Sequence, residues 1–159
     1  MAPSNQTLVL GIGNLLMGDE GVGSVVAQQL ADQRLEAGAV VVDGGTGGFH
    51  LLGLLTGHDP VVIVDATLDG QRPGTVSVLR PRYATDFPRS LTAHDIGLRD
   101  LVEAAALLGP LPEVHLVTVS IGEAPELGTE LSAPVRAAVP AVVERVRAIV
   151  ADLARQRSG

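Results

Sequence analysis

Short apolar segments alternate with segments of helical spacing along the whole chain, and this alternation constrains the fold more than any other feature. The spacing of apolar residues at Val22, Val25, Val26 and Leu30 is typical of one face of a helix. Strands that are apolar on both faces and alternate with amphipathic helices indicate a mostly parallel sheet with helices on both sides. The expected strands cover residues 8–12, 40–42, 61–64, 75–79 and 114–121.

The predicted architecture is therefore a three-layer α/β sandwich around a five-stranded sheet. Further helices are expected around residues 51–55, over 98–108, and from Ser132 to near the end of the chain. Residues 75–79 alternate in polarity more than the other strands, which favours an antiparallel strand at one edge of the sheet. The 159 residues fit a single domain, residues 1–159, with a disordered polar tail at 155–159.

Composition excludes several classes of function. The chain has 18 acidic residues and 11 basic residues, all of them arginine, which gives a net charge of −7. Only 2% of its residues are aromatic. Such a surface repels phosphate backbones and offers few rings for base stacking, so nucleic-acid binding is not expected. The chain has no cysteine, which excludes disulfides, thiolate metal sites and cysteine nucleophiles, and its lack of lysine excludes a P-loop.

The sequence also gives expectations about location and assembly. No apolar run approaches the roughly 18 residues that a membrane-spanning helix needs. The first residues, MAPSNQ, lack the basic and apolar regions of a secretory signal. We therefore expect a cytoplasmic protein without a membrane partner. No additional apolar helix face calls for a second subunit, so a monomer is expected.

Chemically informative residues follow the predicted strands. In open parallel sheets, ligands bind beyond the carboxyl ends of the strands. A glycine-rich segment containing Glu20 follows the first strand, the second strand runs into Asp43, and the third ends at Asp65. The loop before the helix at 98–108 carries His94. These four side chains are expected on one rim of the sheet.

Three familiar sites do not fit this rim. Gly11, Gly13 and Gly18 give the spacing GxGxxxxG, which differs from the GxGxxG of dinucleotide-binding proteins. Asp19 and Glu20 would also place two carboxylates where a pyrophosphate meets the helix. The sequence contains neither the GxSxG elbow of serine hydrolases nor the HExxH helix of zincins.

Glu20, Asp65 and His94 together offer two oxygen ligands and one nitrogen ligand, with positions left open. Such a set suits a divalent metal such as nickel or zinc. It would serve a metal-dependent hydrolase, or a protein that recognises a metal held by another molecule. Each residue also has a structural interpretation. Glu20 could complement a helix dipole, Asp65 could accept structural hydrogen bonds, and His94 could begin a helix.

Several segments resemble a known family. Residues 11–23, GIGNLLMGDEGVG, resemble the opening signature of the hydrogenase maturation proteases. Residues 43–48, DGGTGG, are similar to that family's second block, and residues 64–66, VDA, to its third. Residues 92–98, TAHDIGL, resemble its histidine block, and residues 121–126 are similar to a later stretch. The order and spacing of these blocks agree along nearly the whole chain.

The resemblance implies an endopeptidase that trims the C-terminal extension from the large subunit of nickel–iron hydrogenases. Its partner would be the large-subunit precursor. The family's metal-contacting positions correspond to Glu20, Asp65 and His94, which would contact nickel already seated in the precursor. Cleavage would then follow metal insertion. The nickel would arrive with the substrate, and other divalent metals are expected to substitute in vitro.

The resemblance leaves the bond-breaking step open. The metal could polarise the scissile carbonyl, or Asp43 or Asp65 could activate a water as in an aspartyl protease. Asp43, Gly44, Gly45 and Thr46 are expected to contact the peptide main chain, because glycines allow close approach. Two alternatives remain: a hydrolase that owns its metal, and a non-catalytic factor that binds nickel or the precursor.

Overall fold

The computed structural model describes residues 5–46, 48–88, 97–122 and 126–158. Five strands form one sheet in the order β2-β1-β3-β5-β4. All neighbouring pairs are parallel except β4 and β5, which are antiparallel. This arrangement confirms the predicted α/β fold with an antiparallel edge strand. The strands are β1 (Leu8–Ile12), β2 (Val40–Gly45), β3 (Val61–Thr67), β4 (Val76–Leu79) and β5 (Val114–Ser120).

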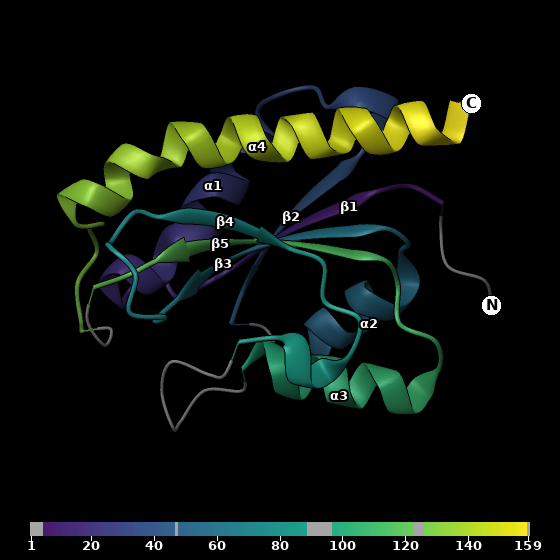
Figure 1. Ribbon diagram of the computed structural model, residues 1–159, viewed down its shortest axis with the longest axis horizontal. Helices are drawn as coiled ribbons and strands as arrows, with labels where there is room; N and C mark the ends of the chain where they lie inside the picture. The colour runs from purple at the N-terminus through teal and green to yellow at the C-terminus, as the bar shows by residue number, and fades with distance from the viewer. Residues whose placement is uncertain (1–4, 47, 89–96, 123–125, 159) are drawn as a thin grey trace.

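Helices cover both faces of the sheet, as Figure 1 shows. The helices α1 and α4 lie on one face, and α2 and α3 lie on the other. Short 3-10 helices occur at Gly18–Gly21, Glu36–Gly38 and Ala84–Asp86. None of the helices that the structure describes is long and apolar enough to cross a membrane. The four α-helices are α1 (Val22–Ala31), α2 (Phe49–Gly57), α3 (Leu98–Leu108) and α4 (Ala133–Ser158).

The alternation of side chains along each strand divides the core into two layers. On β3, Val62 and Val64 pack against α1 and α4, while Val61 and Ile63 pack against α2 and α3. The same division holds along β1 and β5. Because both faces are covered, the first positions of β2 and β3 are apolar without alternation, as the sequence indicated.

The end of the chain differs from the expectation of a disordered tail. Helix α4 continues through residues 155–158, and the buried side chains of Val150 and Leu153 hold its preceding turns against the sheet. In the last turn, Arg157 Nη2 donates a hydrogen bond to the carbonyl oxygen of Asp59 at 3.0 Å. These contacts extend the helix through a segment whose polar composition alone suggested disorder.

Close packing of α1 against the sheet depends on Gly23. A Cβ atom at this position would lie 2.1 Å from the carbonyl oxygen of Ile12 and 2.4 Å from that of Val64. Only a residue without a side chain allows such contact between a helix and the ends of two strands. The preceding 3-10 helix, which carries Glu20, is thereby held next to the carboxyl ends of β1 and β3.

Candidate active site

Asp65 and Glu20 come together at the carboxyl end of the sheet. Asp65 lies on β3, and its Oδ1 accepts a hydrogen bond from the backbone N–H of Ala66 at 2.8 Å. Glu20 lies in the 3-10 helix before α1 and is only 8% exposed. Glu20 and Asp65 are 45 positions apart in the sequence. They lie close together because α1 and the 3-10 helix before it pack against β3.

This proximity changes the acidity of Asp65. The pKa of Asp65 is raised to about 8, mainly by burial and to a smaller extent by the nearby Glu20 carboxylate, while the N–H of Ala66 opposes both effects. A carboxyl group with this pKa holds its proton at neutral pH. Strongly perturbed acids of this kind are concentrated at functional sites.

Asp43 lies at the same end of the sheet but on its other face. Val41 packs toward α1 and α4, so the alternation along β2 directs Asp43 to that side. There the exposed carboxylate accepts hydrogen bonds from Gln28 Nε2 at 3.0 Å and from the backbone N–H of Gly45 at 3.1 Å. Asp65 shares the opposite face with Ile63.

The two aspartates are also separated by a strand. Gly11 of β1 is in register with Asp43 on one side and with Val64, the neighbour of Asp65, on the other. Adjacent strands lie about 4.8 Å apart, so the two backbones are about 10 Å apart across β1. Asp43 and Asp65 therefore do not form the pair of touching carboxyl groups that shares one proton in classical aspartic proteases.

The glycines after Asp43 have structural requirements of their own. A Cβ atom on Gly44 would lie 2.5 Å from Leu51 Cδ2 of helix α2, so the packing of Leu51 leaves no room for a side chain at this position. Gly45 has a φ of +53°, a conformation that side chains disfavour, and its carbonyl oxygen accepts the N–H of Gly13 at 3.1 Å. Thr46 is exposed. A role of this segment in substrate binding stays a prediction.

His94 lies outside the described residues, so the predicted trio with Glu20 and Asp65 stays a prediction. Within the part of the chain that the structure describes, no three His, Asp or Glu side chains are placed to hold a metal. The described residues on the two sides of the segment 89–96 are joined: Arg99 Nε donates to the carbonyl oxygen of Phe87 at 2.8 Å, and Arg99 Nη2 donates to that of Thr85 at 3.1 Å.

Sequence reasoning missed a pair that positions the glycine-rich segment. The carboxylate of Asp19 accepts hydrogen bonds from both the backbone N–H and the hydroxyl of Ser132, each at 2.7 Å. Gly18 and Leu16 of the same segment form backbone hydrogen bonds with Gly128 at 2.8 and 2.9 Å. Hydrogen bonds thus hold the residues next to Glu20 against the segment before α4. Asp19 and Ser132 are 113 positions apart, so no local sequence pattern indicates this contact.

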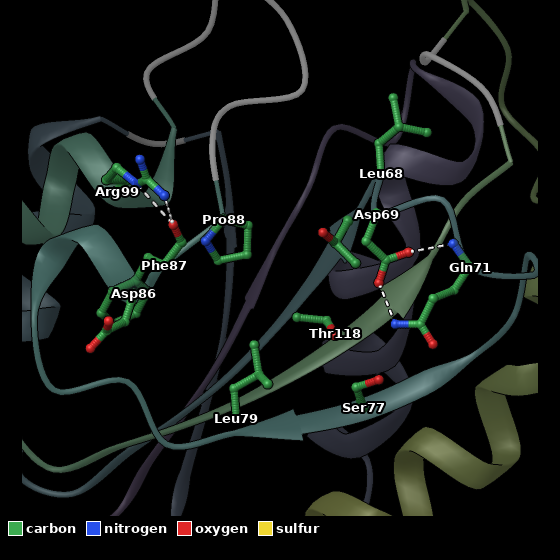
Figure 2. Close-up of a pocket in the computed structure, with 11 residues that line it drawn as sticks. Leu68, Asp69, Gln71, Ser77, Leu79, Asp86, Phe87, Pro88, Arg99 and Thr118 are labelled. Atoms are coloured by element: carbon green, nitrogen blue, oxygen red, sulfur yellow. Dashed lines mark hydrogen bonds between the residues drawn. The ribbon is translucent and has the colours of Figure 1, made fainter.

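A cavity of about 540 Å³ lies beside Asp65 on the α2 and α3 face of the sheet (Figure 2). Its floor includes Thr118, which is in register with Asp65 on the neighbouring strand. Figure 2 shows Pro88 on one side of this floor and Asp69 on the other. Hydrogen bonds from Gln71 and Ser120 lower the pKa of Asp69 against the opposing effect of burial, so this acid is ionised. No motif in the sequence indicates this cavity.

Comparison with known proteins identifies the family. The sequence model of the hydrogenase maturation proteases matches residues 25–149. The chain is 31% identical to the hydrogenase 2 maturation protease of Escherichia coli K12, over 91% of this chain and 90% of that protein. It is 34% identical to the hydrogenase expression/formation protein HupD of Rhizobium leguminosarum, over 89% of this chain and 72% of that protein.

The chain belongs to the hydrogenase maturation protease family. Solved structures agree. The maturating endopeptidase HybD of E. coli superimposes with a TM-score of 0.81 at 32% identity, covering 92% of this chain and 93% of that one. A [NiFe] hydrogenase maturation protease from Thermococcus kodakarensis gives a TM-score of 0.68 at 27% identity, covering 91% and 99%. This protein is a hydrogenase maturation endopeptidase.

Proposed function

We propose that this endopeptidase removes the C-terminal extension of a nickel–iron hydrogenase large-subunit precursor after nickel has been inserted. In this proposal Glu20, Asp65 and His94 contact the nickel of the precursor, which is part of the substrate. The observation that carries the proposal is the buried pairing of Glu20 with Asp65 at the carboxyl end of the sheet, in a chain of this family. The [NiFe] maturation protease of T. kodakarensis, which the fold resembles, supports the class of client.

The pairing of two acids explains how the protease could sense a loaded precursor. Without a cation, the Glu20 carboxylate and burial keep a proton on Asp65. A divalent ion compensates both negative charges, so its approach releases that proton and strengthens binding. A precursor without nickel offers no such compensation. Three side chains also leave the ion incompletely coordinated, so the metal would stay with the precursor.

Cleavage of the peptide bond requires an attacking water. Asp43 and Asp65 lie on opposite faces of the sheet and are separated by β1, so they cannot act on one water as a touching pair. The water would lose its proton to a single carboxylate, or the metal would polarise the scissile carbonyl. Asp43, held by Gln28 and exposed, is suited to contact the substrate main chain together with Gly45 and Thr46, whereas Gly44 is buried against Leu51.

Mass spectrometry of the precursor after incubation with the protease tests this function. Nickel-loaded and nickel-free precursors are compared, using wild-type protease and the variants Glu20→Gln and His94→Ala. We expect loss of a C-terminal peptide from the loaded precursor only, and no loss with either variant. His50→Ala is the matched control, because His50 is an exposed histidine on α2 and should leave processing intact.

Other results would favour the alternatives. Cleavage of both precursor forms would contradict recognition of nickel but leave the protease activity in place. A stoichiometric metal that remains bound to the purified protease would indicate a hydrolase with its own metal. Binding of the loaded precursor without cleavage, by folded protein, would indicate a non-catalytic maturation factor.

A further inference from the structure

Three hydroxyl groups form an unusual floor in the cavity beside Asp65. Thr67 and Thr118 are 7% and 2% exposed, and Ser77 is half-buried. Within the described part of the chain, no hydrogen bond is formed by the side-chain oxygen of any of the three. A nearby hydroxyl behaves differently, since Ser120 Oγ donates to Asp69 at 3.2 Å.

The register of the sheet arranges two of these hydroxyls in a row with Asp65. Thr118 on β5 is in register with Asp65 on β3 and also with Ser77 on β4. The row therefore crosses three neighbouring strands, from the acid to the antiparallel edge strand. At about 4.8 Å between strands, it is about 10 Å long, which is the length of about three residues of extended chain. Thr67 adds a hydroxyl two residues beyond Asp65 on β3.

Apolar side chains stand on both sides of the row. Phe87 and Pro88 lie on one side, and Leu68 lies on the other, as Figure 2 shows. The carbonyl oxygen of Phe87 is fixed by Arg99, so this wall has a defined position. A volume of about 540 Å³ is within the range of about 300–1,000 Å³ that is usual for ligand sites.

The three hydroxyls are open to the solvent in the cavity, so a bound chain must replace their hydrogen bonds to water with polar groups of its own. A bound chain without polar groups at these positions would leave the hydroxyls dehydrated and without partners, which costs free energy. Polar groups along the centre and apolar groups along the sides match an extended peptide, whose amides form a polar line flanked by side chains. Thr and Ser hydroxyls both donate and accept hydrogen bonds, so they suit N–H and C=O groups alike.

We propose that this cavity binds the precursor main chain in extended conformation over Thr118 and Ser77, next to Asp65, which is in register with Thr118 but does not itself line the cavity. The inference rests on the proposed function, because it takes the precursor to be the peptide substrate. The hydroxyls of Thr67, Ser77 and Thr118 hydrogen-bond to main-chain amides and so align the chain with the site at Asp65. Recognition through the main chain makes these residues contribute to substrate affinity without taking part in bond cleavage.

The double variant Thr118→Val and Ser77→Ala tests this proposal with nickel-loaded precursor as the substrate. Both changes nearly preserve shape and remove hydroxyls that have no partner within the described residues, so the thermal midpoint should remain within a few degrees of the wild type. We expect KM for the precursor to rise about tenfold and kcat to change less than twofold, as uniform binding predicts. Thr56→Val is the matched control, since its hydroxyl is satisfied by Leu52 on the exposed side of α2.

A second measurement separates this inference from the proposed function. Binding of a synthetic peptide with the sequence of the precursor C-terminal region needs no cleavage, and the double variant should bind it about tenfold more weakly than the wild type. If the wild type processes the loaded precursor and the double variant shows an unchanged KM, the cavity holds only water and the inference fails. Equal peptide affinity for both proteins, or no binding by the wild type, would likewise overturn it.

Discussion

The two aspartates at the carboxyl end of the sheet show how much the face of a strand determines chemistry. Asp65 faces the side of the sheet that α2 and α3 cover. It is buried near Glu20 and has a pKa raised to about 8. Asp43 faces the α1 and α4 side, is exposed to solvent, and receives hydrogen bonds from Gln28 and Gly45. Both residues follow a run of apolar residues within their strand, yet only Asp65 lies beside a second carboxylate.

The largest expected effect separates the two aspartates directly. Asp65→Asn should lower processing of nickel-loaded precursor by about 100-fold or more, because it removes a proposed metal contact. Asp43→Asn should act mainly through KM, because its carboxylate is assigned to peptide contact. Steady-state kinetics followed by mass spectrometry would measure both parameters. A stronger loss of kcat in Asp43→Asn than in Asp65→Asn would reverse the assignment.

The second prediction concerns the glycine that brings Glu20 to Asp65. Gly23→Ala introduces a Cβ atom that would overlap the carbonyl oxygens of Ile12 and Val64, so α1 must move away from the strands. We expect the free energy of unfolding to fall by about 3 kcal/mol, measured by urea denaturation. Gly53→Ala is a suitable control, because a Cβ atom there meets no atom within 4 Å. Equal stability of the two variants would refute the close contact.

The third prediction uses the raised pKa of Asp65. Between about pH 5 and 7 this carboxyl is protonated in the folded chain and ionised in the unfolded chain, so the folded state binds the additional proton. Its contribution to stability must therefore decline as the pH rises, by up to about 1.4 kcal/mol per pH unit. Denaturation of the metal-free protein at several pH values would reveal this decline, and Asp65→Asn should remove it.

The control for this titration is Glu20→Gln. Removing the Glu20 charge eliminates one cause of the raised pKa but leaves burial in place. The decline in stability should then end at a lower pH than in the wild type. A decline that is identical in the wild type, Glu20→Gln and Asp65→Asn proteins would show that another group is responsible.

The fold and the residues at the carboxyl ends of the strands can be predicted from the sequence. The way in which those residues are arranged relative to one another cannot. Apolar periodicity identifies the strands and helices, and the ends of the strands identify Glu20 and Asp65. This periodicity does not reveal the face on which Asp43 lies, because the three valines before it on β2 show no alternation between apolar and polar residues. Strand order and register, which separate Asp43 from Asp65, are not encoded in local spacing.

The cavity floor and the anchoring of the glycine-rich segment were missed for other reasons. Threonine is a common strand residue, so Thr67 and Thr118 in the sequence look like ordinary strand formers. Their position on the floor of the cavity becomes visible only when the described residues around them are in place. The hydrogen bonds between Asp19 and Ser132 join segments that are distant in the sequence, and a pattern within one segment cannot indicate them.

The smallest expected effect comes from the residue that holds Asp43. Gln28 Nε2 donates to the Asp43 carboxylate at 3.0 Å on an exposed surface, so Gln28→Ala should cost only about 0.5–1 kcal/mol in unfolding free energy. If Asp43 contacts the peptide, loss of this hydrogen bond lets its side chain turn, and KM should rise severalfold while kcat stays constant. Asp43→Asn, Gln28→Ala and the double variant then form a cycle in which the two effects on KM are not additive. Independent effects would mean that Gln28 stabilises the helix surface alone and that Asp43 is oriented by Gly45.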